Sequence, residues 1–223
     1  MNSPAQLALD LIQPLTPSLD NFVPGRNAEA VSALRALAAG QGAQFVYLWG
    51  EPGCGRSHLL AALAAEGGCL GRAGAVPEFT PAARLYLVDD ADALNEAGQA
   101  RFFRLVNEIR GVPDARLASA GAAPPARLDL REDVRTRLAW GLVYQLHALS
   151  DVEKAQALLA HAGSRGIVLT PEVRAWMLAH LPRDMRTQVA VLDALDAYAL
   201  ARKRPITLPL LREWLAAGGR GDA

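Results

Sequence analysis

A glycine-rich segment, Gly50-Glu51-Pro52-Gly53-Cys54-Gly55-Arg56-Ser57, has the spacing of a phosphate-binding loop. Glycines let backbone N–H groups turn inward around a polyphosphate, and the N-terminus of a following helix adds its positive end. Ser57 can place its hydroxyl on a magnesium ion. Arg56 stands where the pattern has lysine, and a planar guanidinium is not equivalent to an ammonium. The segment predicts nucleotide binding with impaired hydrolysis; the alternative is a plain turn between a strand and a helix.

Two carboxylates, Asp89 and Asp90, follow the apolar run Leu85-Tyr86-Leu87-Val88. Ligands of parallel sheets bind at the carboxyl ends of the strands, so the pair belongs near the glycine-rich segment. Asp89 can hold magnesium, and Asp90 is the candidate general base. Asp90 is shorter than the glutamate usual at that position. The alternative is an acidic strand end without a chemical role.

The elements that must position these residues alternate between strand and helix. Expected strands cover 44–49, 84–90, 115–121 and 141–146, and expected helices cover 26–39, 56–66 and 96–109. In the last of these helices Phe103, Val106 and Ile109 are predicted to share the buried face. This alternation predicts a parallel α/β sheet flanked by helices, the P-loop architecture. The stretch 67–83 is short for a full passage, so its edge strand is expected to be reduced or absent, with at most a vestige near Ala75-Val76.

After Ser150 the pattern changes to helices only, over 151–162, 171–180, 184–201 and 208–216. Ser150 with Glu153 has the pattern of a capping box, and Thr170-Pro171 opens the second helix. The sequence therefore predicts an arm at 1–17, an α/β domain at 18–150, a small helical lid at 151–217 and a disordered tail at 218–223.

Arg186 lies in the first turn of the helix that begins near Asp184, where a cation opposes the helix dipole. A phosphate partner would offset this cost. The alternative is a surface ion pair with Asp184 or Asp193.

The composition excludes several classes of protein. With 23 basic and 23 acidic residues the net charge is +0, without the positive surplus of a protein that coats DNA, so little direct DNA binding is expected. No apolar run approaches the roughly 18 residues that span a bilayer, and no signal peptide opens the chain. Cys54 and Cys69 form neither a metal cluster nor a disulfide framework. A cytoplasmic location without a membrane partner is expected.

The two motifs and the lid together resemble the AAA+ ATPases and, within them, the DnaA-like proteins. Five segments carry the resemblance: Leu19 to Asn27 for the adenine border, Gly50 to Leu60 for the phosphate loop, Ala123-Pro124-Pro125 for the end of sensor I, Arg135-Thr136-Arg137-Leu138 with Trp140-Gly141 for the arginine finger, and Asp184-Met185-Arg186-Thr187 with Leu192-Asp193 for the sensor II helix.

Within the DnaA-like proteins the sequence is most similar to the Hda family, whose members inactivate the initiator together with the replication sliding clamp. The loop version Gly55 to Leu60 points there, and so does a chain that ends after the lid without a helix-turn-helix domain. The arm also carries Gln6-Leu7-Ala8-Leu9-Asp10-Leu11, which looks like the family's clamp-binding peptide. The alternative for the arm is a strand that folds onto the core.

The resemblance implies a regulator of replication initiation that binds ADP or ATP with magnesium. It assigns the cofactor to Phe22, Val23, Gly50, Pro52, Gly53, Cys54, Gly55, Arg56, Ser57, His58 and Arg186, the metal to Ser57 and Asp89, and the clamp to Gln6, Leu7, Leu9 and Leu11. DnaA is the second partner, and a homodimer is a further expectation.

In this family Arg137 would be the arginine finger, presented in trans to ATP held by DnaA, with Arg135 as the competing candidate. Where sensor I has a polar side chain, this chain reads Ala120-Gly121-Ala122-Ala123, which argues against strong intrinsic ATPase activity. The alternatives are a self-hydrolysing AAA+ ATPase of DnaA or helicase-loader type and an adaptor with an inactive nucleotide pocket.

Overall fold

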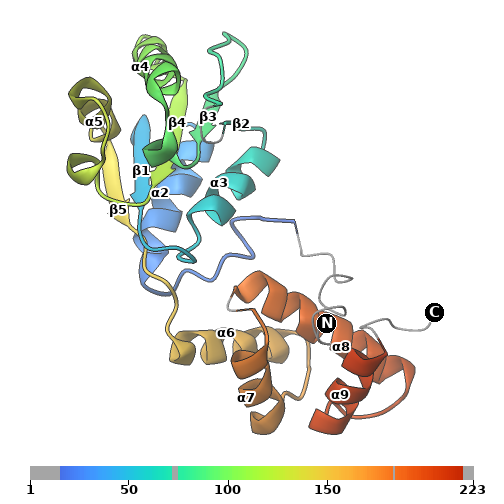
Figure 1. Cartoon of the computed structure of the whole chain (residues 1–223). Coiled ribbons are helices and arrows are strands. Elements are labelled where there is room, and N and C mark those ends of the chain that lie inside the picture. Colours follow the sequence, from blue (N-terminus) through green and yellow to red (C-terminus); the bar gives the residue numbers. More distant parts are fainter. Residues whose placement is uncertain (1–15, 72–74, 183, 218–223) are drawn as a thin grey trace. The chain divides into compact units, whose positions relative to one another are not determined.

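The computed structural model describes residues 16–71, 75–182 and 184–217. The candidate clamp-binding residues Gln6, Leu7, Leu9 and Leu11, and the expected tail at 218–223, lie outside these residues. The chain divides into two compact units, one of which is Pro17–Ala148 and the other of which contains Leu149–Ala223. Figure 1 shows strands only in the first unit and helices only in the second.

Five parallel strands form one sheet in the order β2-β3-β4-β1-β5. Their bounds are β1 Phe45–Trp49, β2 Cys69–Gly71, β3 Leu85–Val88, β4 Arg116–Gly121 and β5 Leu142–Gln145. β3 is buried along its whole length, as its continuous apolar sequence predicts. β5 is an edge strand and stays largely exposed. The predicted parallel α/β architecture is therefore confirmed.

Helices cover both faces of the sheet, and each face has its own apolar core. One core contains α2 (Ala28–Ala38) and α3 (Arg56–Ala65), and the other contains α4 (Glu96–Arg110) and α5 (Glu132–Leu138). The described part of this unit also contains the short 3-10 helices η1 Gly25–Asn27, η2 Ala91–Ala93 and η3 Pro125–Arg127. This doubly wound arrangement brings the strand ends that follow β1, β3 and β4 to one edge of the sheet.

The edge strand is present in the reduced form that the sequence analysis allows for: β2 has three residues and pairs with β3 in the register Cys69↔Tyr86 to Gly71↔Val88. The described residues Ala75 and Val76 are not in a strand. Two other local features differ from expectation. α5 is not predicted from the sequence because its seven residues carry only two buried side chains, too few for a visible period. In α4 the buried aromatic residue is Phe102, while Phe103 is partly exposed.

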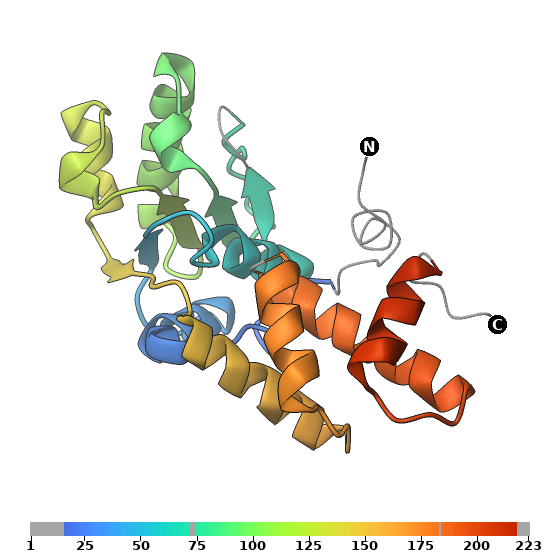
Figure 2. The ribbon, with the colours of Figure 1, turned by 60° about the horizontal axis from the view of Figure 1, so that its bottom comes forward.

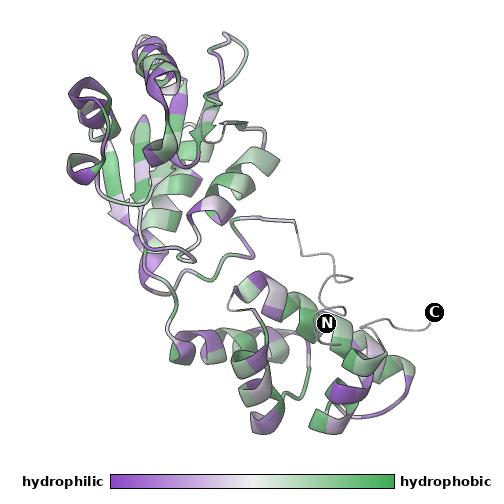
Figure 3. Ribbon diagram, in the orientation of Figure 1, coloured by the Kyte–Doolittle hydropathy of each residue, from purple (hydrophilic) through white to green (hydrophobic). Residues whose placement is uncertain are grey.

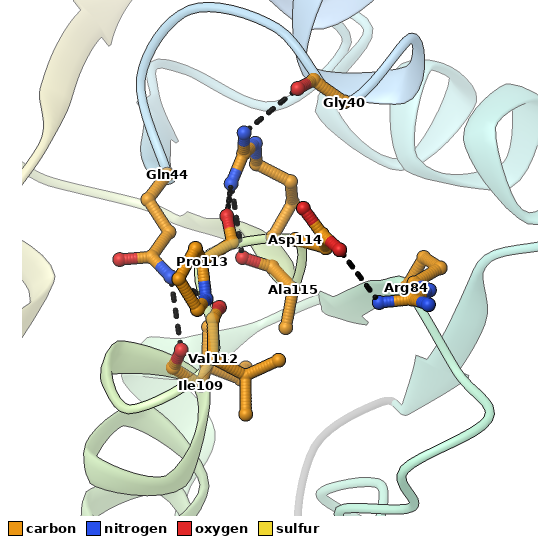
Figure 4. A network of polar contacts seen from close by, with 9 residues as sticks. Gly40, Gln44, Arg84, Ile109, Val112, Pro113, Asp114 and Ala115 are labelled. Atoms are coloured by element: carbon orange, nitrogen blue, oxygen red, sulfur yellow. Dashed lines mark hydrogen bonds and ion pairs between the residues drawn. The ribbon is translucent and has the colours of Figure 1, made fainter.

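A polar network closes the amino-terminal edge of the sheet (Figure 4). The Gln44 amide donates to the carbonyl oxygens of Ile109 and Val112, both at 2.9 Å, and so ties the start of β1 to the end of α4. The Arg116 guanidinium donates to the Gly40 carbonyl at 2.7 Å. Carbonyl groups at these chain reversals thus find side-chain donors, and the last turn of α4 is held in place.

The second unit consists of α6 Asp151–Ser164, α7 Pro171–His180, α8 Met185–Ala201 and α9 Leu208–Ala216 (Figure 2). The apolar residues of each helix recur as stripes in Figure 3, and the core contains Leu158, Met177, Leu195, Leu210 and Trp214, all fully buried. The predicted capping box of Ser150 and Glu153 is present, and the Thr170 side chain caps α7. Nowhere in the described part of the chain is a helix both long and apolar enough to span a bilayer.

Candidate nucleotide site

The glycine-rich loop leaves β1 at Trp49 and enters α3 at Arg56, the strand–loop–helix context that a phosphate loop requires. Gly53 and Gly55 have φ angles of 82° and 100°, a backbone region that favours glycine. A Cβ on Gly50 would collide with the Leu146 carbonyl oxygen and would lie 2.9 Å from the Cys54 sulfur. The sequence pattern of glycines therefore reflects backbone geometry and not composition.

The N-terminus of α3 is open. No side chain caps it, and the Leu59 amide is the first to close a turn, onto the Gly55 carbonyl at 3.0 Å. Helix N-termini with free N–H groups attract phosphate, and the helix dipole adds to this attraction. A Cβ on Gly53 would meet nothing within 4 Å, so open space lies over the loop. The backbone of this loop fits a polyphosphate.

The Arg56 side chain carries the clearest sign of a missing partner. Its Nη1 atom is buried and has no hydrogen-bond partner within the described ranges. Buried donors in native proteins are almost always paired, so an unpaired guanidinium nitrogen beside a phosphate-type loop fits an anion. Cys54 lies beneath the same loop at 4% exposure, and burial raises the pKa of its thiol, which stays neutral.

The two carboxylates occupy different environments at the end of β3. Asp89 is 4% exposed, and its Oδ1 accepts from the Asp90 amide at 3.0 Å. Asp90 is exposed and has a φ of 49°, a left-handed conformation that is uncommon for a residue other than glycine. Such conformations persist where the surrounding structure imposes them, and they concentrate at functional sites.

A magnesium ion would need ligands from outside the protein. Among residues 16–71, 75–182 and 184–217 no three His, Cys, Asp or Glu side chains gather in a metal-binding group. Ser57 and Asp89 offer one hydroxyl and one carboxylate, while magnesium in nucleotide sites takes most of its ligands from phosphates and water. The donor set is compatible with magnesium bound together with a nucleotide.

The expected adenine border lies against the phosphate loop. The Phe22 ring packs on Gly55, whose Cβ would lie 2.5 Å from Phe22 Cε2, and its centroid is 5.5 Å from that of His58. A cavity of about 360 Å³ opens beside Phe22, between the segment before α2 and α2 itself. Val23 is half-buried and does not line it. The residues that line the cavity are Leu19, Asp20, Phe22, Pro24, Ala28, Val31, Ser32 and Arg35.

Within the helical unit, Arg186 is half-buried in the first turn of α8. The Asp184 side chain caps the helix by accepting from the Thr187 amide at 2.8 Å. Asp193 binds His161 at 2.7 Å and Arg165 at 3.5 Å. Neither aspartate pairs with Arg186, so the surface ion pair considered from the sequence is wrong.

The chain is similar to known proteins in the sequence of its helical unit and in its fold. Residues 151–215 match the family model described as "Hda, lid domain". Domain III of the replication initiation protein DnaA from Thermotoga maritima has the same fold, with 19% identity and a TM-score of 0.65, over 91% of this chain and 99% of that one. Residues 151–215 therefore resemble an Hda-type lid, and the chain as a whole has the fold of DnaA domain III.

Two further solved structures share the fold of this chain. AMPPCP-bound DnaA from Aquifex aeolicus is 19% identical, with a TM-score of 0.64, over 87% of this chain and 70% of that one. The Holliday junction branch migration motor RuvB from Thermotoga maritima is 16% identical, with a TM-score of 0.60, over 90% and 72%.

At the position expected for sensor I, the end of β4, a side chain from β1 fills the space. A Cβ on Gly121 would collide with the Tyr47 hydroxyl, which donates to the Ala123 carbonyl at 2.8 Å. Asp92 Oδ1 accepts from the Ala122 amide at 3.0 Å. Burial, and then the Asp92 charge, raise the pKa of Tyr47. The sequence analysis misses Tyr47 and Asp92, and only the position of Asp92 shortly after Asp89 could have suggested either.

The two candidate fingers differ in their surroundings. The Arg137 guanidinium carbon lies 3.7 Å from the centre of the Phe103 ring, and Arg137 Nη1 donates to the Asp133 carbonyl at 2.9 Å. Arg135 is half-buried, without a ring or a carboxylate against its guanidinium in the parts of the chain that are described. Arg137 is therefore the arginine that the surrounding side chains hold in one place.

Proposed function

We propose that this protein is a nucleotide-bound regulator that promotes hydrolysis of ATP held by DnaA, while its arm binds the replication sliding clamp. The Hda-type lid and the DnaA-like fold support DnaA as the partner. DnaA structures with the same fold have been solved with AMPPCP bound, which supports an adenine nucleotide, ADP or ATP, on Gly53, Gly55, Arg56 and Ser57 here.

The position of Arg137 carries the proposal. Trp140, beside Arg137, contacts Phe45 at the start of β1, whereas the phosphate loop follows Trp49 at its end. β1 has five residues, so its first and last Cα atoms are roughly 13 Å apart at about 3.3 Å per step. Arg137 thus lies at the far end of the strand from this chain's own phosphate loop, which supports a role toward a nucleotide on another molecule.

The chemistry that Arg137 would assist is phosphoryl transfer to water. Water attacks the γ-phosphorus of the ATP on DnaA, the bond to the β–γ bridging oxygen breaks, and ADP leaves with that electron pair; inorganic phosphate and a proton are released. Negative charge accumulates on the phosphoryl oxygens, and a guanidinium supplied in trans stabilises it by about 10³ to 10⁵ in rate. Phe103 and Trp140 would restrict the guanidinium before the partner arrives, which lowers the entropy cost of contact.

Two other functions are weighed on specific observations. At the expected sensor I position Gly121 lies against the Tyr47 hydroxyl, which donates its proton to the Ala123 carbonyl. No side chain there orients water, which disfavours a self-hydrolysing ATPase. The unpaired Arg56 nitrogen and the open loop disfavour an adaptor with an inactive pocket. We expect hydrolysis by the protein alone close to background.

The deciding experiment compares Arg137→Ala with Arg135→Ala in stimulated hydrolysis by DnaA, with clamp loaded on DNA. Arg137→Ala should keep fold and nucleotide binding but lose stimulation by 10³ to 10⁵, on the order of 4 to 7 kcal/mol. Arg137→Lys should restore little, because an ammonium lacks the planar fork. Loss in Arg135→Ala alone would move the finger by two residues. Full activity of both variants would exclude hydrolysis in trans.

Clamp docking through the arm is tested separately. Alanine at Gln6, Leu7 and Leu9 removes one amide and two apolar side chains, so clamp affinity should collapse while the thermal melt is unchanged. Loss of the cooperative melt instead would show that the arm belongs to the core. Direct duplex binding should stay weak and fall steeply with salt; tight, sequence-specific retardation of origin DNA would favour an initiator.

A further inference from the structure

Two arginine side chains, Arg137 and Arg110, pack against the Trp140 ring. The guanidinium carbon of Arg137 lies 4.9 Å from the centre of the Trp140 ring, and that of Arg110 lies 4.8 Å from it. The separation of the two cations therefore cannot exceed about 10 Å, the screening length at 0.1 M salt, so each guanidinium feels the charge of the other. The two like charges on this indole repel each other, so the arrangement is unfavourable unless another group offsets the repulsion.

No carboxylate neutralises this pair within residues 16–71, 75–182 and 184–217. Arg137 donates to a backbone carbonyl and, at 3.4 Å, to the side-chain oxygen of Asn107. The nearest acid along α5, Asp133, directs its Oδ2 to Arg131 at 2.6 Å. Arg110 is exposed and has the indole as its contact. Two cations without a counter-ion, on an aromatic surface that is 39% exposed, attract an anion.

The cluster is held by elements that are distant in sequence. Arg110 is the last residue of α4, whose final turn is tied to β1 by Gln44 (Figure 4). Trp140 packs edge-on against Phe45, with ring centres 6.2 Å apart. Gly141, next to it, has no room for a Cβ because the Phe45 carbonyl occupies that space. The rigid sheet edge thus fixes the indole and, through it, both guanidiniums.

We propose that Arg110 and Arg137 form one anion site on Trp140, which binds the terminal phosphates of a nucleotide held by a second protein. This inference rests on the proposed function and adds Arg110 to it. A triphosphate presents several negative charges within a few ångströms, so it matches two adjacent guanidiniums better than a single carboxylate ligand would. Arg137 contacts the transferred phosphoryl group, and Arg110 binds the neighbouring phosphate oxygens.

The first experiment measures stimulated ATP hydrolysis by DnaA as a function of the concentration of this protein. Arg110→Gln should lower the maximal rate roughly 10- to 150-fold, the range for loss of a hydrogen bond to a charged group. Arg110→Lys should recover part of the rate because it keeps the charge. Arg104→Gln is the matched control, since Arg104 is an exposed arginine of the same helix and touches neither ring nor acid among the described residues. It should match the parent.

The second experiment needs no DnaA. The parent, saturated with Mg-ADP, is titrated with inorganic tripolyphosphate, and tryptophan fluorescence is recorded. Arg110→Gln and Arg137→Gln should each weaken the response at least tenfold, whereas Arg104→Gln should not. A single-stranded oligonucleotide is titrated in parallel; binding of the oligonucleotide, but not of tripolyphosphate, that depends on Arg110 would overturn the proposal in favour of a nucleic acid.

The two assays separate the two hypotheses. If the parent fails to stimulate DnaA but binds tripolyphosphate through Arg110, the proposed function fails and the anion site stands. If the parent stimulates DnaA and Arg110→Gln equals Arg104→Gln in both assays, the site fails and the function stands. An effect of Arg110→Gln only on the concentration for half-maximal stimulation, with the maximal rate intact, would make Arg110 a docking contact and overturn the phosphate role.

Discussion

Replacing Arg56 by methionine should change stability and nucleotide affinity in opposite directions. Methionine keeps the length and the apolar stem of the side chain but removes the guanidinium. One guanidinium nitrogen of Arg56 is buried and has no partner among the described residues. A polar group in that state costs about 1 to 3 kcal/mol. Because Arg56 is only half-buried, the lower end applies, and we expect the free energy of unfolding to rise by about 1 kcal/mol.

The nucleotide complex should respond the other way. A hydrogen bond to a charged group contributes about 1.5 to 3 kcal/mol, so losing the contact between Arg56 and phosphate should weaken ADP binding by roughly 10- to 150-fold. The gain in the free protein corresponds to a Tm about 2 to 4 °C higher for a chain of this size. The combination of a higher Tm without nucleotide and a weaker Kd for ADP is the expected signature.

The assay is a thermal melt followed by circular dichroism, without nucleotide, together with calorimetric titration of Mg-ADP. Arg127→Met is the control, because Arg127 is an exposed arginine of the same unit at the end of η3. It should leave both quantities within error. A Tm lowered by several degrees in Arg56→Met, with ADP affinity unchanged, would show that the guanidinium supports the fold and would refute its role toward phosphate.

Three further predictions test other parts of the structure. Iodoacetamide at pH 8 should alkylate the exposed Cys69 and spare Cys54, whose thiol pKa is raised by burial; mass spectrometry that finds Cys54 alkylated first would contradict the loop geometry. Gly163 lies in open space near the end of α6, so Gly163→Ala should raise the free energy of unfolding by about 0.4 to 1 kcal/mol in denaturant titrations. Gly141 has no room for a Cβ, so Gly141→Ala should lower the free energy of unfolding. Equal effects of the two variants would contradict the close packing of Gly141 at the start of β5. The hydrogen bond from Arg204 lowers the pKa of Glu213 from 4.5, so the stability that this carboxylate adds at neutral pH should be lost as the pH falls below 4.5. A Glu213→Gln variant should lack that part of the acid transition. An unchanged acid transition would contradict the pairing of Glu213 with Arg204.

Local sequence determined the phosphate loop and most of the elements around it. A loop that turns through Gly53 and Gly55 at positive φ accepts few other residues, so its pattern is visible without any long-range contact. The continuous apolar run of β3 and the capping box at Ser150 are equally local signals. For the same reason the change from alternating strands and helices to helices alone was visible in the sequence.

The sequence alone did not define the short elements β2 and α5, because contacts with neighbouring elements stabilise them. β2 has three residues and exists through its pairing with β3, while α5 has seven residues and only Val134 and Leu138 buried. Neither segment is long enough to display a period, and cooperative helix formation at that length depends on packing. Tertiary contacts therefore decided the edge of the sheet.

The partners of individual charged side chains were likewise decided by the fold. The sequence placed Arg186 near Asp184 and Asp193, but helix packing directs one of these aspartates to an amide and the other to His161. Arg110 and Trp140 are thirty positions apart, and they meet only because β5 runs parallel to β1 at the sheet edge where α4 ends. Residue types and spacing set the chemistry available at each position, and the packing of distant segments set which charges share one surface.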